Sequence, residues 1–135
     1  MNCNTHQPGR RGAATVEAAV CLPVILLLLF GSMEAANAVF LKQTATMAAY
    51  EGAATGSHPN GTSASVRERC RAVLEARNIS QFRVDVNPPS LSEQTPIGTP
   101  LYVRVTIPAS EAAMGPLWLY EGREVSYIAH MPRTK

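Results

Sequence analysis

One uncharged, apolar stretch constrains this chain more than any other feature. It runs from Ala18 to Met33, and its centre reads Val-Ile-Leu-Leu-Leu-Leu-Phe. As a helix, these 16 residues would span about 24 Å, less than the roughly 30 Å hydrocarbon core of a bilayer. Continuing the helix to Leu41 supplies the missing length and brings Glu34 toward the membrane surface. The stretch therefore predicts a membrane-spanning or signal segment.

The rest of the chain is small. The 135 residues have room for one domain, and removing the apolar segment leaves a head of roughly 80 residues. At that size a single hydrophobic core is marginal. Such a head can hold one helix on a small sheet, but hardly a deep catalytic cleft.

The first twelve residues are polar and basic and show no hydrophobic periodicity, which is typical of a leader. They end in Arg10-Arg11-Gly12. Arginines next to an apolar segment favour the cytoplasmic side of the membrane. As a plain signal anchor, the chain would keep Arg10 and Arg11 in the cytoplasm and translocate its C-terminal head.

A cleaved secretory signal is another interpretation, because Ala36-Asn37-Ala38 has the A-x-A pattern of a signal-peptidase site. A cut after Ala38 would release a secreted protein. The charge of Glu34, between the apolar stretch and this site, argues against such a cut. Neither a signal peptide nor a plain anchor needs Glu17, which directly precedes the apolar stretch.

Glu17 is informative because an unpaired carboxylate at the edge of hydrocarbon costs a few kcal/mol and is a functional candidate by default. A cut after Gly12 would make Ala13 the new N-terminus and place Glu17 fifth. In a stack of parallel helices, the new ammonium group of one subunit can pair with the carboxylate of its neighbour. Such a pair would neutralise both charges and set the axial register between subunits.

The residues around Gly12 are similar to the class III prepilin cleavage signature of type IV pilin-like proteins. More narrowly, they resemble the start of the TadE-like pseudopilins of the tight-adherence (Flp) pilus. Members of that family typically begin R-x-G-x-x-x-V-E-F-A, continue apolar and carry a proline; Ala18 departs from this pattern, which usually has an aromatic residue there. The resemblance covers roughly residues 10–56 and rests on Arg10-Arg11-Gly12-Ala13-Ala14-Thr15-Val16-Glu17-Ala18-Ala19-Val20-Cys21-Leu22-Pro23.

This resemblance implies a minor pseudopilin that a prepilin peptidase cuts between Gly12 and Ala13. Its partners would be that peptidase, other pilins and pseudopilins, the pilus assembly platform and membrane lipid. It would cross the inner (cytoplasmic) membrane once, with a cytoplasmic N-terminus and an extracytoplasmic head, and act in assembly of a Tad/Flp pilus or a related secretion filament. Residues 1–12 would then be the leader, 13–56 the transmembrane and stalk helix, and 57–135 the αβ head.

Two alternatives remain open beside this hypothesis. One is a membrane-anchored binding module whose anchor is never cleaved, and the other is the secreted protein cut after Ala38. Only the pseudopilin hypothesis gives the carboxylate of Glu17 a role.

Pro23 lies within the apolar stretch, where a proline removes one backbone hydrogen bond and predicts a kink in the helix. Beyond the membrane, residues 33–55 are rich in alanine and lack proline, which favours a continuous helix. Their mixture of small and large apolar residues predicts a stalk that packs against neighbouring subunits or against its own sheet. Turn-forming residues at 56–61 end this helix.

The remaining sequence predicts an α+β fold, with a head of one helix and a three-stranded antiparallel sheet. Thr62 or Ser63 caps the helix, and Asn78 ends it. The second strand alternates, with its valines on one face and Thr106 on the other. Strands are predicted, from their apolar alternation, at Gln81–Val86, Leu101–Ile107 and Glu124–Met131.

A short helical turn is predicted at residues 109–114, before the apolar patch Leu117-Trp118-Leu119-Tyr120. This patch has two interpretations. It closes the open edge of the core, or it offers Trp118 and Tyr120 as a contact for a pilus partner or the membrane surface, since aromatic residues favour interfaces.

The sequence gives no sign of an enzyme. The three histidines lie in the leader, a turn and the final strand, and the three cysteines lack C-x-x-C spacing. We therefore expect no catalytic constellation and no metal site. No phosphate loop or dinucleotide fingerprint is present, so we expect no cofactor. Net charge is +2, and glutamates interrupt the arginines at residues 67–75, which argues against a nucleic-acid partner.

Overall fold

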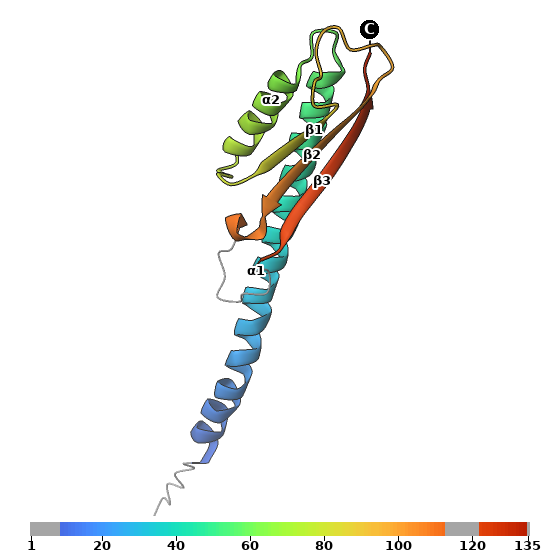
Figure 1. Cartoon of the computed structure of the whole chain (residues 1–135). Helices are drawn as coiled ribbons and strands as arrows, with labels where there is room; N and C mark the ends of the chain where they lie inside the picture. The colour runs from blue at the N-terminus through green and yellow to red at the C-terminus, as the bar shows by residue number, and fades with distance from the viewer. Residues whose placement is uncertain (1–8, 113–121, 135) are drawn as a thin grey trace, which may run out of the picture.

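The computed structural model describes residues 9–112 and 122–134 of the chain. A long helix, α1, leads into a head in which a second helix and a sheet surround its C-terminal half (Figure 1). The elements in chain order are α1 (Gly9–Ser57), α2 (Ser63–Glu75), β1 (Arg83–Asn87), β2 (Pro100–Pro108), the short 3-10 helix η1 (Ala109–Ala112) and β3 (Glu124–Pro132).

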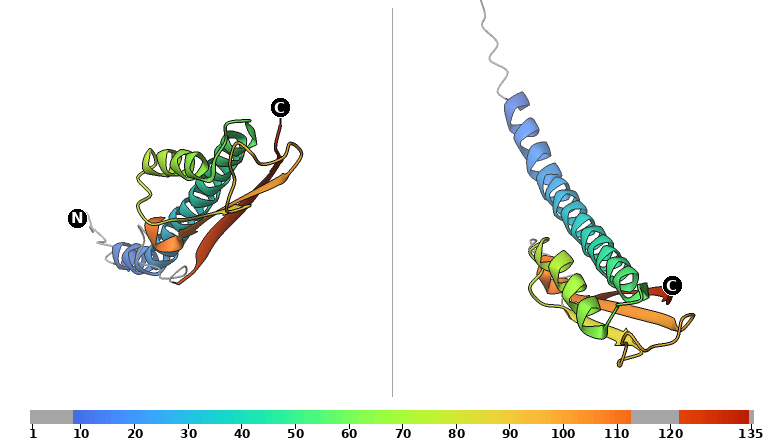
Figure 2. Two further views of the ribbon diagram at one scale, coloured as in Figure 1. Left: turned by 45° about the horizontal axis from the view of Figure 1, so that its top comes forward. Right: turned by 90° about the horizontal axis from the view of Figure 1, so that it is seen from above.

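The three strands form one antiparallel sheet in the order β1-β2-β3. Both helices lie on the same face of this sheet, and the other face is open (Figure 2). The predicted α+β class, with its long N-terminal helix, second helix and three-stranded antiparallel sheet, is therefore confirmed. Because the chain order matches the order in the sheet, each strand pairs with its predecessor without a crossover.

The head is built around the inner face of α1, which carries small side chains. Ala45, Ala48, Ala49 and Ala53 are fully buried against α2 and the sheet. Small side chains let the neighbouring elements approach the helix backbone closely. Around them pack other buried apolar residues from α2 and all three strands, among them Val66, Cys70, Leu74, Val86, Leu101, Val103, Val105, Ile107 and Ala129.

A capping box fixes the start of α2. The Thr62 hydroxyl accepts a hydrogen bond from the backbone N–H of Ser65, and the Ser65 hydroxyl accepts one from the N–H of Thr62. The predicted cap at Thr62 or Ser63 is thus confirmed. The α-helix itself stops at Glu75, and the turn that follows leads to the predicted end at Asn78. There the backbone N–H of Asn78 donates to the carbonyl oxygen of Glu75, and that of Ile79 donates to the carbonyl oxygen of Leu74. Asn78 ends that turn with a φ of 58°, a left-handed conformation that asparagine tolerates.

The strands lie where the apolar alternation predicts them, with shifts of one or two residues at their ends. Thr106 does alternate with the valines, but it is buried rather than exposed. The predicted helical turn appears as η1, which ends at Ala112. The predicted contact residues Trp118 and Tyr120 lie outside the described residues.

The C-terminal segment ties the head to the end of α1. Arg133 is 3% exposed, and its guanidinium donates hydrogen bonds to the carbonyl oxygens of Gly61 and Pro59. Thr134 donates both its backbone N–H and its hydroxyl to the carbonyl oxygen of Ser57, at 2.8 and 3.1 Å. The positive charge of Arg133 thus lies beside the C-terminal end of α1, where the helix dipole is negative.

The turn between α1 and α2 depends on the absence of a side chain at Gly61. A Cβ at this position would lie 2.6 Å from the carbonyl oxygen of Thr55 and 2.7 Å from that of Gly56. Both obstacles are backbone atoms, so they cannot move without distorting the end of α1.

We therefore predict that Gly61→Ala destabilises the head by about 1–3 kcal/mol, the usual cost of overpacking. The measurement is urea unfolding of the full chain in lipid nanodiscs, followed by circular dichroism. Gly31→Ala is the matched control, because a Cβ at Gly31 has no atom within 4 Å. Equal stability of the two variants would contradict the prediction.

Candidate functional site: the anchor helix and its outer face

The N-terminal half of α1 projects from the head, and no element among the described residues covers it (Figures 1 and 2). Its large apolar residues between positions 16 and 29 are between 40% and 70% exposed. Among the described residues, α1 is the one helix long and apolar enough to cross a membrane. Since water would not tolerate so much exposed apolar surface, this part of α1 fits a single-pass membrane anchor.

The head begins on α1 at Glu34, which is only 7% exposed. The sequence suggests a position toward the membrane surface for this residue, and the structure adds that its side chain is covered. Its Oε2 atom has no hydrogen-bond partner within the described parts of the chain. Glu34 thus marks the boundary between the projecting anchor and the segment of α1 that the head covers.

The predicted processing residues, Gly12 and Ala13, lie one turn above the start of α1 at Gly9. Arg10 and Arg11 belong to the same first turn of the helix. The first turn of a helix lacks intrahelical partners for its N–H groups and frays readily. The bond between Gly12 and Ala13 thus lies next to the part of α1 that opens at least cost.

Glu17 is exposed on the projecting part of α1, four residues after Ala13. In an α-helix this separation places the two residues one turn apart on the same side. Neither of the ion pairs found among the described residues involves Glu17. Its carboxylate is therefore available to a group from outside this chain.

Pro23 lies inside α1, which continues through it as one helix from Gly9 to Ser57. The kink predicted at Pro23 remains a prediction.

From the end of the apolar stretch onward, α1 carries a set of six exposed residues, four of which are large and apolar. They follow a spacing of three and four residues, which averages 3.5 and keeps them on one side of the helix. Phe40 is 41% exposed and Tyr50 is 61% exposed. We call this set the outer stripe; it comprises Met33, Ala36, Phe40, Gln43, Met47 and Tyr50.

Arg77, just after α2, borders the outer stripe. Its guanidinium carbon lies 5.7 Å from the centre of the Phe40 ring, within the range of a cation–π contact. The same group donates hydrogen bonds to the Thr44 hydroxyl at 3.3 Å and to the Met47 sulfur at 2.9 Å. The side chain thus covers one edge of the stripe and leaves the rest open.

The described residues contain no side-chain cluster suited to metal binding. Among these residues, no group of three or more histidine, cysteine or acidic side chains lies close enough together to hold a metal ion.

Cys70 is a buried thiol. Burial raises the pKa of the Cys70 thiol to about 11, and the thiol donates a hydrogen bond to the carbonyl oxygen of Ala48. A thiol with such a pKa is almost wholly protonated at neutral pH and is a poor nucleophile.

The assignment of the two faces of α1 can be tested by one pair of substitutions. Tyr50→Ser should change the free energy of unfolding of the head by less than about 0.5 kcal/mol, as for other surface sites. Ala49→Leu, one residue earlier but fully buried, should destabilise it by about 1–3 kcal/mol. Urea unfolding of both variants in nanodiscs gives the comparison, and a large loss for Tyr50→Ser alone would reverse the assignment.

Comparison with known proteins points to the same helix. The family described as TadE-like protein matches residues 12–54, which cover most of α1. No curated protein and no solved structure gives a significant match. Over residues 12–54 the chain is therefore TadE-like, as the residues around Gly12 indicate.

Proposed function

We propose that this protein is a minor pseudopilin of a Tad/Flp pilus or a related secretion filament. A prepilin peptidase cuts it after Gly12, and the processed chain joins the filament through parallel packing of its N-terminal helix. The observation that carries the proposal is an uncovered apolar helix that bears a TadE-like sequence and an exposed carboxylate at Glu17.

The membrane gives all copies of the helix the same direction. Arg10 and Arg11 remain on the cytoplasmic side of the inner membrane, and the head lies on the opposite side. Residues 1–12 act as the leader, and residues 57–135 complete the extracytoplasmic head. Neighbouring helices in one membrane can therefore pack only in parallel.

Parallel packing brings the processed N-terminus of one subunit close to Glu17 of another. The ammonium group of Ala13 and the carboxylate of Glu17 carry opposite charges, and each is costly to leave alone in a low dielectric. A pair between subunits removes both costs, whereas any other axial offset leaves both charges unpaired. The pair thereby sets the register of the filament.

The outer stripe continues this packing surface above the membrane. Its spacing of three and four residues extends downward through Leu29, Leu26 and Leu22, all of them exposed. Two helices with such a repeat pack along their whole length with a left-handed supercoil. A neighbouring subunit thus covers side chains such as Phe40 and Tyr50, which are exposed in the single chain.

The two alternatives account for fewer of these observations. An uncleaved anchored module needs neither the exposed Glu17 nor the outer stripe. A secreted protein cut after Ala38 requires cleavage within the unbroken helix α1, four residues after the first point that the head covers.

Processing is tested by N-terminal sequencing of the mature protein from its native membrane. We expect the sequence to begin at Ala13. A start at Met1 would leave an uncleaved anchored module, and a start at Val39 would identify a secreted protein. Either of those results would overturn the proposal.

The register pair is tested by Glu17→Lys, which places two positive charges where the pair requires opposite ones. We expect normal membrane insertion and a folded head but loss of filaments, measured by electron microscopy and by blotting of sheared material. Glu68→Lys is the control, because Glu68 is exposed on α2 and its contact with Arg71, at 3.8 Å, contributes little. Normal filaments with Glu17→Lys would refute the pairing.

A further inference from the structure

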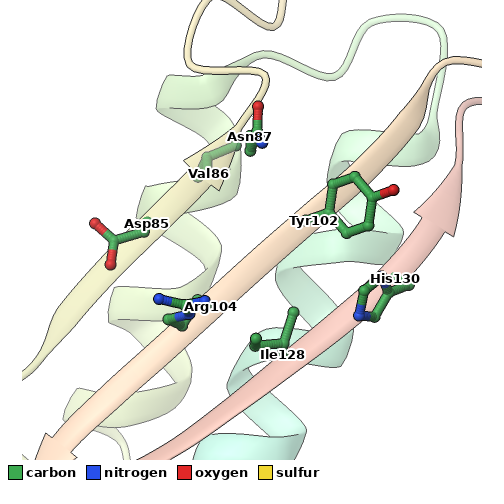
Figure 3. Close-up of a pocket in the computed structure, with 7 residues that line it drawn as sticks. All are labelled: Asp85, Val86, Asn87, Tyr102, Arg104, Ile128 and His130. Atoms are coloured by element: carbon green, nitrogen blue, oxygen red, sulfur yellow. The ribbon is translucent and has the colours of Figure 1, made fainter.

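The open face of the sheet contains a hollow of about 470 Å³ that the filament hypothesis does not use (Figure 3). Its volume falls within the usual range for small-molecule sites. Its residues lie toward the ends of β1 and β3 and the start of β2, and Figure 1 shows the end of β3 on the part of the head farthest from the free end of α1. The residues that line it come from all three strands and are Asp85, Val86, Asn87, Tyr102, Arg104, Ile128 and His130.

Two rows of side chains cross the strands at this hollow. One row is Asn87, Tyr102 and His130, which the strand register places directly opposite one another. The rings of Tyr102 and His130 meet edge to face, with centroids 4.6 Å apart and an angle of 88° between planes. Because the two planes are almost perpendicular, one ring can lie flat against a ligand while the other supports it from the side, and the amide of Asn87 lies at the end of the row.

The second row is Asp85, Arg104 and Ile128. Asp85 and Arg104 are direct cross-strand partners and are both exposed, yet they form no ion pair with each other. Within the described chain, their side chains make no hydrogen bond either. A carboxylate and a guanidinium with free hydrogen-bonding capacity thus lie side by side, with an aliphatic side chain next to the guanidinium.

This combination restricts the class of ligand. The single positive and single negative charge cancel, so a strongly anionic ligand such as a nucleic acid gains little here. The many polar groups make the site unsuitable for a purely apolar ligand. A peptide that pairs through its backbone would use a strand edge rather than the face of a sheet.

A neutral saccharide has the required chemistry, because its ring presents C–H groups on its faces and hydroxyl groups around its rim. We propose that this hollow binds a neutral saccharide. The Tyr102 ring contacts the sugar's C–H face with His130 packed against it edge to face, and the sugar's hydroxyl groups donate to Asp85 and accept from Arg104 and Asn87. Because the hollow is open, affinity is in the millimolar range, and binding is independent of filament assembly.

The test uses the full chain in lipid nanodiscs, since maltoside detergents would themselves supply a sugar. Maltotriose, cellotriose and chitotriose are titrated while the backbone amide signals of β1, β2 and β3 are followed by NMR. We expect saturable shifts at Tyr102, Arg104 and His130 with at least one of the three. Tyr102→Ala and Arg104→Gln should each weaken binding roughly tenfold or more.

Arg83→Gln is the matched control, because Arg83 is exposed on β1 but does not line the hollow. Signals from the core should stay unchanged in every variant, which shows that the head remains folded. Glu17→Lys should bind the sugar like the unaltered chain, so failure of the filament proposal would not affect this test.

Three results would overturn the proposal. One is the absence of saturable shifts with all three sugars, and another is binding that survives both Tyr102→Ala and Arg104→Gln. The third is a shift of the same signals with protein concentration in the absence of sugar, which would identify the face as a contact between proteins.

Discussion

Alanines on the inner face of α1 hold the head together, because they let α2 and the sheet approach the helix backbone closely. Ala45, Ala48, Ala49 and Ala53 lose all contact with water in this arrangement. The anchor and the central element of the head are therefore parts of one continuous helix. As a result, any force or rotation applied to the membrane segment reaches the head without passing through a flexible linker.

At the C-terminal end of α1, hydrogen-bond donors of the C-terminal segment pair with backbone carbonyl oxygens. Helix α1 ends with carbonyl oxygens that lack partners within the helix. Arg133 and Thr134 supply donors to this region, and the positive charge of Arg133 suits the negative end of the helix. The turn that carries Gly61 fits under this contact only because glycine has no side chain. The C-terminal segment thus completes a structure that begins with the anchor.

The same construction leaves two exposed surfaces of different character. The outer stripe on α1 is apolar except for Gln43 and is continuous with the membrane segment, so it suits another helix that leaves the same bilayer in parallel. The open face of the sheet is polar, balanced in charge and distant from the membrane. Because the two surfaces lie on different elements, contacts along the helix leave the hollow beside Tyr102 accessible.

The sequence by itself determined the elements of this protein, because hydrophobic periodicity and local capping are written in neighbouring residues. It predicted the long helix, the cap at Thr62, the three strands and the TadE-like segment that contains Glu17. Only the tertiary structure decided that the alanines of α1 face inward while Phe40 and Tyr50 face outward. It also decided that Thr106 is buried and that Asp85, Arg104 and Tyr102 share one hollow. These features depend on contacts between residues far apart in the chain, which no local pattern records.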